Sequence, residues 1–197
     1  MSGQIVLVRH GRTALNAQGR MQGRLDEPLD EVGERQAAAL ARYLSSELGP
    51  DDLVVSSPLQ RAVRTAEMIA NGRDVRIDER WIELAYGEFD GRLQSEIPAD
   101  TWARWRRDDD FSPPGGESLR EVSERVVGAC TEMLDRAVGR RVVIVSHVSP
   151  IKAAIVWALG ADPSLSWRMR LDTAAVSRIA VAGEATSLTS FNETHHL

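Results

Sequence analysis

The 197-residue chain is poor in several residue types that define whole classes of protein. Its single cysteine, Cys130, excludes an internal disulfide framework and a zinc site built from cysteines. No apolar run approaches the roughly 18 residues that a transmembrane helix needs. Residues 1–11 lack the long apolar stretch and the small-residue cleavage site of a secretory signal peptide. We therefore expect a cytoplasmic protein without a membrane partner.

Basic charge is also scarce relative to acidic charge. The chain carries 24 basic and 29 acidic residues, which gives a formal net charge of −5 at pH 7. Recognition of nucleic acid depends on a basic surplus, so we expect no nucleic-acid partner. Lys152 is the only lysine, so arginine is the usual cation in this chain and no arginine is informative by itself. The length and the apolar fraction of 43% predict a globular protein, with a single domain over residues 1–197.

Apolar runs along the chain mark the predicted strands. Residues 4–8 and 142–145 are continuous apolar runs, which indicate strands that are buried on both faces. Shorter strands are predicted at 53–55 and 75–77. Residues 174–191 alternate like two antiparallel strands around a Gly-Glu turn.

Helical spacing of apolar residues marks the segments between these strands. Two helices are predicted to open at a proline, Pro58 and Pro150, because proline is favoured in the first turn. A third opens at a capping box formed by Ser118 and Glu121. The predicted helices lie at residues 31–48, 58–70, 102–107, 118–134 and 150–159, and residues 83–91 are predicted as an irregular loop. This order predicts a three-layer α/β/α sandwich with a mainly parallel sheet and an antiparallel edge.

Two histidines occupy the same position relative to a buried strand. The chain has four histidines, and two of them, His195 and His196, lie in the last three residues. The other two, His10 and His147, each follow a buried strand by one polar residue. Ligands bind at the carboxyl ends of the strands in such sheets. This shared position favours a functional role for the pair over two unrelated packing roles.

Several chemistries are open to this pair of imidazoles. Zinc requires three or four ligands, and no Asp or Glu stands beside either histidine at ligand spacing. Cys130 lies on the apolar stripe of a predicted helix, and Ser146 is not in a Gly-x-Ser-x-Gly turn. A histidine nucleophile remains, because imidazole forms covalent intermediates. Arg9 beside His10 suits an anionic electrophile, since the guanidinium group matches phosphate geometry.

A series of motifs in fixed order carries a resemblance to a known family. The motifs are Arg9-His10-Gly11 with Thr13 and Asn16, Ser56-Ser57-Pro58-Leu59-Gln60-Arg61-Ala62, Glu83 to Gly91, Pro114-Gly115-Gly116-Glu117-Ser118, and Ser146-His147. On these residues the chain resembles the histidine phosphatases, also called the phosphoglycerate mutase-like superfamily. The resemblance implies a phosphoglycerate mutase-like fold and a phosphomonoesterase that needs no metal and no cofactor.

The resemblance also implies roles for individual residues. His10 is implied as the nucleophile that becomes phosphohistidine, with Arg9, Arg61 and His147 around the phosphoryl group. Glu83 is implied as the acid that protonates the leaving oxygen and later as the base that activates water.

Other assignments remain open from the sequence alone. Glu88 and Asp90 lie close to Glu83, and spacing by itself does not choose among the three carboxylates. The resemblance implies further phosphate contacts from Asn16, Gln22, Gly23 and Ser57. For Asn16, an ordinary turn role is the alternative. Glu117 is interpreted as a charge at a helix start rather than a catalytic group.

The expected reaction is hydrolysis of a small phosphorylated metabolite. Family mutases resemble one another in a longer insertion after the segment that corresponds to residues 83–91, here called the acid loop. In this chain only residues 92–114 separate the acid loop from the Gly-Gly-Glu-Ser turn. The alternatives are a cofactor-dependent phosphoglycerate mutase and a non-catalytic member that binds phosphorylated ligands. Residues 146–152 resemble the α-ribazole phosphatase branch, and a homodimer is a further hypothesis. Trp102 and Trp105 are expected either to pack on the body of the protein or to form a substrate wall.

Overall fold

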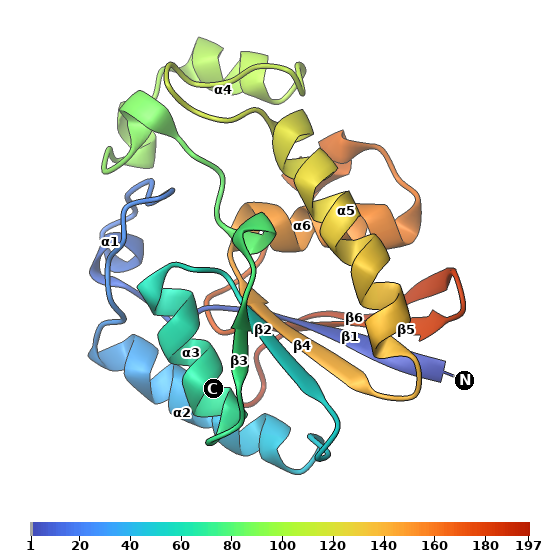
Figure 1. Cartoon of the computed structure of the whole chain (residues 1–197). Coiled ribbons are helices and arrows are strands. Elements are labelled where there is room, and N and C mark those ends of the chain that lie inside the picture. The colour runs from blue at the N-terminus through green and yellow to red at the C-terminus, as the bar shows by residue number, and fades with distance from the viewer. Residues whose placement is uncertain (1) are drawn as a thin grey trace.

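The structure, a computed structural model that describes residues 2–197, is built around one six-stranded sheet (Figure 1). The strands are β1 (Ser2–Arg9), β2 (Leu53–Ser56), β3 (Val75–Ile77), β4 (Arg141–Ser146), β5 (Val176–Ala182) and β6 (Ala185–Glu193). They lie in the order β3-β2-β4-β1-β5-β6. The first four in this order are parallel, whereas β5 and β6 are antiparallel to their neighbours. The predicted mainly parallel sheet with an antiparallel edge is confirmed.

Helices cover both faces of this sheet. The α-helices are α1 (Ala14–Ala17), α2 (Glu31–Ser45), α3 (Gln60–Ala70), α4 (Ala99–Trp105), α5 (Leu119–Ala137) and α6 (Val148–Leu159). Short 3-10 helices are η1 (Glu79–Trp81), η2 (Gly87–Phe89), η3 (Gln94–Glu96) and η4 (Pro163–Arg168). Figure 1 shows α2 and α3 on one face of the sheet and α5 and α6 on the other, so the three predicted layers are present. Within residues 2–197, no helix combines the length and the apolar character needed to cross a membrane.

Alternate side chains of β1 enter different layers of the core. Val6 and Val8 pack in a cluster with residues of α2 and α3. Ile5 and Leu7 pack in a second cluster with residues of α5 and α6. Burial on both faces explains why this strand reads as a continuous apolar run. Cys130 lies in the second cluster, where burial raises the pKa of its thiol, so the packing interpretation is confirmed.

The helix expected to open at Pro58 begins two residues later. The N–H of Ser57 donates to the carbonyl of Val145 at 3.0 Å, which keeps the chain extended beyond β2. The N–H of Gln60, the first residue of α3, donates to the Asp26 carboxylate at 2.8 Å. A carboxylate from a distant segment therefore sets the start of this helix.

The helix expected to open at Pro150 begins two residues earlier, at Val148. His147 is its N-cap residue but makes no side-chain cap hydrogen bond. The Glu83 carboxylate instead accepts the N–H groups of Val148 at 3.0 Å and Ser149 at 3.1 Å. These two amides have no partner within the helix, and Glu83 satisfies both from another loop.

The remaining helix boundaries differ from the predictions by a few residues. The capping box at Ser118 is confirmed, with the Ser118 N–H on the Glu121 carboxylate at 2.7 Å and the Glu121 N–H on the Ser118 hydroxyl at 3.2 Å. α4 begins at Ala99, directly after Pro98, and α2 ends at Ser45. Proline fixes its own backbone and lacks an N–H, which suits the position just before a helix.

The strand ends bring three distant segments to one edge of the sheet. Arg9 and Ser146 are paired in register between β1 and β4. The N–H of His10 then donates to the carbonyl of Ser146 at 3.0 Å, so His10 and His147 leave neighbouring strands at the same level. Ser57 leaves β2 beside β4 and joins them. This edge is where the sequence analysis placed the site.

Candidate active site

His10 and His147 lie side by side at the carboxyl edge of the sheet. Their ring centroids are 5.0 Å apart, and the residues are 3% and 0% exposed. Each follows its strand directly, so the rigid sheet fixes the separation of the rings. The predicted meeting of the two histidines is therefore present in the fold.

The ring of His10 is held in one tautomer. Its Nδ1 lies 2.7 Å from the carbonyl of Gly11, and a carbonyl only accepts, so the proton sits on Nδ1. Burial, followed by the charges of Arg61 and Arg9, holds the pKa of His10 well below its usual value. The imidazole is neutral near pH 7, with the lone pair on Nε2.

The Arg61 guanidinium lies beside this lone pair, and that of Arg9 is a second buried cation of the site without a carboxylate partner. The Arg61 Nε lies 3.3 Å from the His10 Nε2, and the other nitrogens of Arg61 donate to the carbonyls of Leu25 and Gly23, each at 2.7 Å. Arg9 donates to the carbonyl of Leu171 at 2.6 Å, and its buried Nε has no partner. Within residues 2–197, neither arginine forms an ion pair.

This pair of cations creates a site for an anion. Burial is the main cause that lowers the pKa of Arg61 to about 10, and burial also lowers the pKa of Arg9. Both remain protonated near neutral pH. A buried cation with no counter-charge is unfavourable, and a phosphate group would supply that charge in the geometry that guanidinium prefers.

His147 pairs with a serine from the second predicted motif. Its Nε2 lies 2.6 Å from the Ser57 hydroxyl, and its buried Nδ1 has no partner. Burial, then the charges of Arg61, His10 and Arg9, hold the pKa of His147 well below its usual value. The side chains of Ser57 and His147 thus form a neutral polar pair next to the two arginines.

The Glu83 carboxylate is held at the start of α6. It accepts the N–H groups of Leu84 at 2.8 Å, Val148 at 3.0 Å and Ser149 at 3.1 Å, and the residue is 5% exposed. The carbonyl of Glu83 accepts from Arg24 at 3.2 Å. The positive end of the helix dipole also stabilises a carboxylate at this point.

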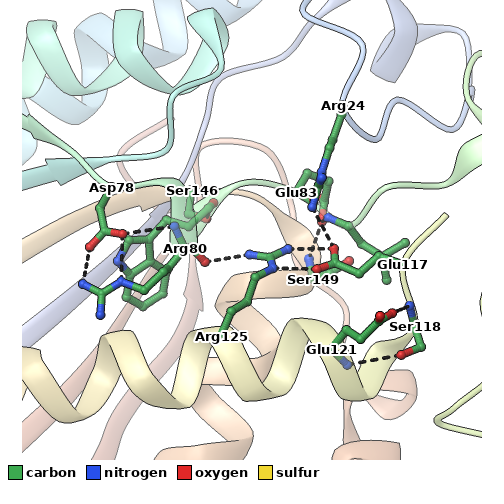
Figure 2. Close-up of polar contacts among 12 residues, drawn as sticks. Arg24, Asp78, Arg80, Glu83, Glu117, Ser118, Glu121, Arg125, Ser146 and Ser149 are labelled. Atoms are coloured by element: carbon green, nitrogen blue, oxygen red, sulfur yellow. Dashed lines mark hydrogen bonds and ion pairs between the residues drawn. The ribbon is translucent and has the colours of Figure 1, made fainter.

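A chain of ion pairs anchors the loop that carries Glu83 (Figure 2). Arg24 donates to the Glu117 carboxylate at 3.2 Å, and Arg125 of α5 donates to the same carboxylate at 2.8 and 3.0 Å. Arg125 also donates to the carbonyl of Arg80 at 2.6 Å. Glu117 is therefore a bridge between two arginines, which agrees with its assignment as a non-catalytic charge.

The two alternative carboxylates have different surroundings. Glu88 is exposed on η2. Asp90 is half-buried, and burial raises the pKa of its carboxyl group to about 6. Its Oδ1 is buried without a partner, against the position that a Cβ at Gly23 would take. Glu83 is the carboxylate that the fold holds at α6, and Asp90 is the second acid near the site.

The remaining predicted phosphate contacts lie on the segment between β1 and α2, here called the first loop. Gln22 is buried, its Oε1 accepts from the Thr13 hydroxyl at 2.9 Å, and its Nε2 donor has no partner. Gly23 has a φ of +50°, and its carbonyl accepts a hydrogen bond from Arg61. Asn16 forms a capping box with Thr13 at the start of α1, so its Oδ1 is already engaged. A phosphate contact from each of these residues stays a prediction.

A cavity of about 530 Å³ lies against the residues that hold Glu83, and its wall includes Trp102 and Trp105. Its lining residues come from the first loop, the acid loop, α4, α5, α6 and the η4 region: Met21, Leu84, Tyr86, Gln94, Ser95, Trp102, Trp105, Arg106, Leu119, Val148, Ser149, Lys152, Ser166 and Trp167. Trp105 is 1% exposed and packs in the core cluster, whereas Trp102 is half-buried against it. The packing role of Trp105 is confirmed, and a substrate contact from Trp102 stays a prediction. The two tryptophans were the sequence signal for a wall here, whereas Lys152 stood out only as the one lysine of the chain.

Within residues 2–197, no group of three or more His, Cys, Asp or Glu side chains is arranged to hold a metal ion. Independence from metals and cofactors stays a prediction.

The chain belongs to the histidine phosphatase superfamily (branch 1), whose sequence pattern matches residues 5–194. It is 36% identical over 203 residues to phosphoserine phosphatase 1 of Hydrogenobacter thermophilus, across 98% of this chain and 94% of that protein. It is 39% identical over 183 residues to the probable phosphoglycerate mutase GpmB of Cronobacter sakazakii, across 89% and 84%.

Solved structures agree with this membership. A mutant of phosphoserine phosphatase from Entamoeba histolytica in complex with phosphoserine superposes with a TM-score of 0.89, at 27% identity and over 98% of each chain. The predicted phosphoglycerate mutase-like fold is confirmed. The chain spans about half, 55%, of the length of the first curated relatives that it matches.

Proposed function

We propose that the chain is a metal-independent phosphomonoesterase that acts on small phosphorylated metabolites through a phosphohistidine intermediate at His10. The observation that carries this proposal is the state of the His10 ring. Its proton is on Nδ1, its pKa is low, and its Nε2 lies 3.3 Å from a guanidinium group that has no carboxylate partner. A neutral nucleophile beside free positive charge is what attack on a phosphate ester requires.

The reaction proceeds in two half-reactions. First, with Glu83 protonated once the anionic ester is bound beside it, the His10 Nε2 attacks phosphorus and a P–N bond forms. The P–O bond to the leaving group breaks as Glu83 gives its proton to the leaving oxygen. Second, Glu83 takes a proton from water, the water oxygen attacks phosphorus, and the P–N bond breaks to release phosphate and neutral His10. Each residue returns to its starting protonation state.

The residues around His10 stabilise the charge on the transferring phosphoryl group. Arg9 and Arg61 neutralise its oxygens. The neutral Ser57–His147 pair supplies a further hydrogen bond, donated by whichever of the two residues does not use its proton in the bond between them. Catalysis of phosphoryl transfer rests mainly on such positioning and charge stabilisation. The names of the relatives, phosphoserine phosphatase and probable phosphoglycerate mutase, support a small phosphorylated acid as the type of substrate.

The proposal is tested by turnover of p-nitrophenyl phosphate. The His10→Ala variant is expected to lose activity by at least about a thousandfold, because loss of a covalent nucleophile removes the whole first half-reaction. A His195→Ala variant, which changes a histidine near the C-terminal end, serves as the matched control and is expected to retain activity. Absence of turnover in the unaltered protein would favour the non-catalytic phosphate-binding alternative.

The mutase alternative is tested in the same preparation. Formation of 2-phosphoglycerate from 3-phosphoglycerate, without release of inorganic phosphate, would favour a mutase. We expect phosphate release, because residues 92–114 between the acid loop and the Gly-Gly-Glu-Ser turn leave the site without a long insertion. The single domain, cytoplasmic location, homodimer and resemblance to α-ribazole phosphatases stay predictions, as does the absence of nucleic-acid and membrane partners.

A further inference from the structure

The cavity of about 530 Å³ lies on the Glu83 side of the site, although Glu83 itself is not among its lining residues. The three residues whose N–H groups hold the Glu83 carboxylate, Leu84, Val148 and Ser149, also line the cavity. His10 does not line it. Because Glu83 protonates the leaving oxygen, the part of the substrate beyond that oxygen faces this space.

The charge of the cavity wall is entirely positive. No aspartate or glutamate is among the lining residues, although the chain has 29 acidic and 24 basic residues. The two charged side chains are Lys152 of α6 and Arg106, which directly follows α4. Arg106 places its guanidinium 5.9 Å from the centroid of the Trp102 ring. Within residues 2–197, neither cation has a carboxylate partner within ion-pair distance.

Lys152 is the less solvated of the two cations. It is half-buried, and burial lowers the pKa of its ammonium group, with Glu83 opposing this effect and Arg9 adding to it. A partly buried ammonium without a partner gains free energy when a ligand supplies a negative charge. Ser149, whose N–H donates to the Glu83 carboxylate, lies three residues before Lys152 on α6, and both residues line the cavity.

We propose that the cavity is a leaving-group subsite in which Lys152 binds a carboxylate of the substrate. The inference rests on the phosphomonoesterase function proposed above and specifies its substrate class. That class is phosphate monoesters of hydroxy acids, in which a carboxylate lies a few bonds from the ester oxygen. Arg106 adds positive charge at the same wall, and the tryptophans provide apolar surface for the rest of the leaving group.

A pair of substrates that differ only in the carboxylate tests this assignment. In glycerol 3-phosphate a hydroxymethyl group replaces the carboxylate of 3-phosphoglycerate. We expect the unaltered protein to prefer 3-phosphoglycerate in kcat/KM by about ten- to hundredfold, the usual effect of a hydrogen bond between charged groups. Lys152→Met is expected to abolish most of this preference, and Lys152→Arg to retain it.

Each preference is a ratio measured within one variant, so a general loss of activity cancels. Arg42→Met is the matched control, because it removes one exposed cation from α2 on the opposite face of the sheet. An unaltered protein that uses both substrates equally would overturn the subsite. So would a Lys152→Met variant that slows both substrates by the same factor, since Lys152 would then act on the reaction centre.

Binding separates failure of the subsite from failure of the proposed function. If the unaltered protein does not hydrolyse p-nitrophenyl phosphate, the phosphatase proposal fails by itself. Calorimetric titration of the unaltered protein and Lys152→Met with both compounds then tests the subsite alone. Tighter binding of 3-phosphoglycerate that depends on Lys152 supports the subsite, and equal affinities overturn it.

Discussion

At the scale of the residue, two contacts hold His10 in the state that the proposed attack on phosphate requires. One partner accepts a hydrogen bond from the ring, and the other donates one to it. The Gly11 carbonyl accepts the Nδ1 proton, and the Arg61 guanidinium lies by Nε2. The first contact fixes the tautomer, and the second adds a positive charge that disfavours protonation of the ring. In the proposed mechanism, the bound phosphate replaces the His10 Nε2 as the main partner of the Arg61 guanidinium. Arg61 therefore adds to the effect of burial in keeping the His10 ring neutral, and in the proposed mechanism it also attracts the phosphate.

Glu83 is expected to matter most for substrates with poor leaving groups. In a Glu83→Gln variant, an alkyl phosphate should lose about a hundred- to ten-thousandfold in kcat, the usual contribution of general acid catalysis. p-Nitrophenyl phosphate should lose much less in the first half-reaction, because p-nitrophenolate leaves without a proton. Pre-steady-state release of the leaving group from both substrates measures the difference.

Asp90 provides the comparison for this experiment. Burial raises the pKa of its carboxyl group to about 6, so Asp90 can hold a proton more readily than an ordinary aspartate. An Asp90→Asn variant should slow the two substrates to similar extents. Equal losses in Glu83→Gln, together with an alkyl-specific loss in Asp90→Asn, would move the acid role to Asp90.

At the scale of the element, local patterns predicted the existence of helices better than their ends. The capping box of α5 is confirmed because both partners, Ser118 and Glu121, lie within one turn. The starts of α3 and α6 depend on Asp26 and Glu83, which lie far from these helices in sequence. Proline position alone therefore misplaces both starts, since the deciding hydrogen bonds form only in the folded chain.

The two tryptophans of α4 are expected to respond differently to replacement by leucine. Trp105 is 1% exposed and lies against Tyr86, Phe111 and Trp167, so Trp105→Leu should lower the free energy of unfolding by about 2–3 kcal/mol. Trp102 is half-buried, so Trp102→Leu should cost about 1 kcal/mol or less and change the ranking of substrates. Equilibrium urea unfolding measures the first effect, and kcat/KM on several phosphate esters measures the second. A loss of stability below about 0.5 kcal/mol in Trp105→Leu would contradict its core role.

At the scale of the whole molecule, the sheet and the motif residues were predictable for different reasons. The buried strands have continuous apolar runs, and their parallel order places His10 and His147 at one edge. The family pattern supplied Arg61 and Glu83, which no local periodicity marks. The hydrogen bonds that hold Glu83 come from α6, and they could not be read from either segment by itself.

The cavity shows the limit of prediction from this sequence. Its wall combines residues from Met21 to Trp167, and their approach depends on how the acid loop, α4 and η4 fold over the sheet. Lys152 was noticeable as the only lysine, but its place on this wall depends on that assembly. The chain is acidic as a whole, yet its substrate side carries positive charge from Arg9, Arg61, Arg106 and Lys152.

The central claim is that a phosphoryl group passes through His10, and rapid-quench trapping tests it most directly. The unaltered protein is mixed with ³²P-labelled p-nitrophenyl phosphate and quenched within one turnover. We predict a base-stable, acid-labile label that peptide mapping places on His10 and that is absent from the His10→Ala variant. A label on a serine, which is acid-stable and base-labile, or turnover without any trapped label, would contradict the mechanism.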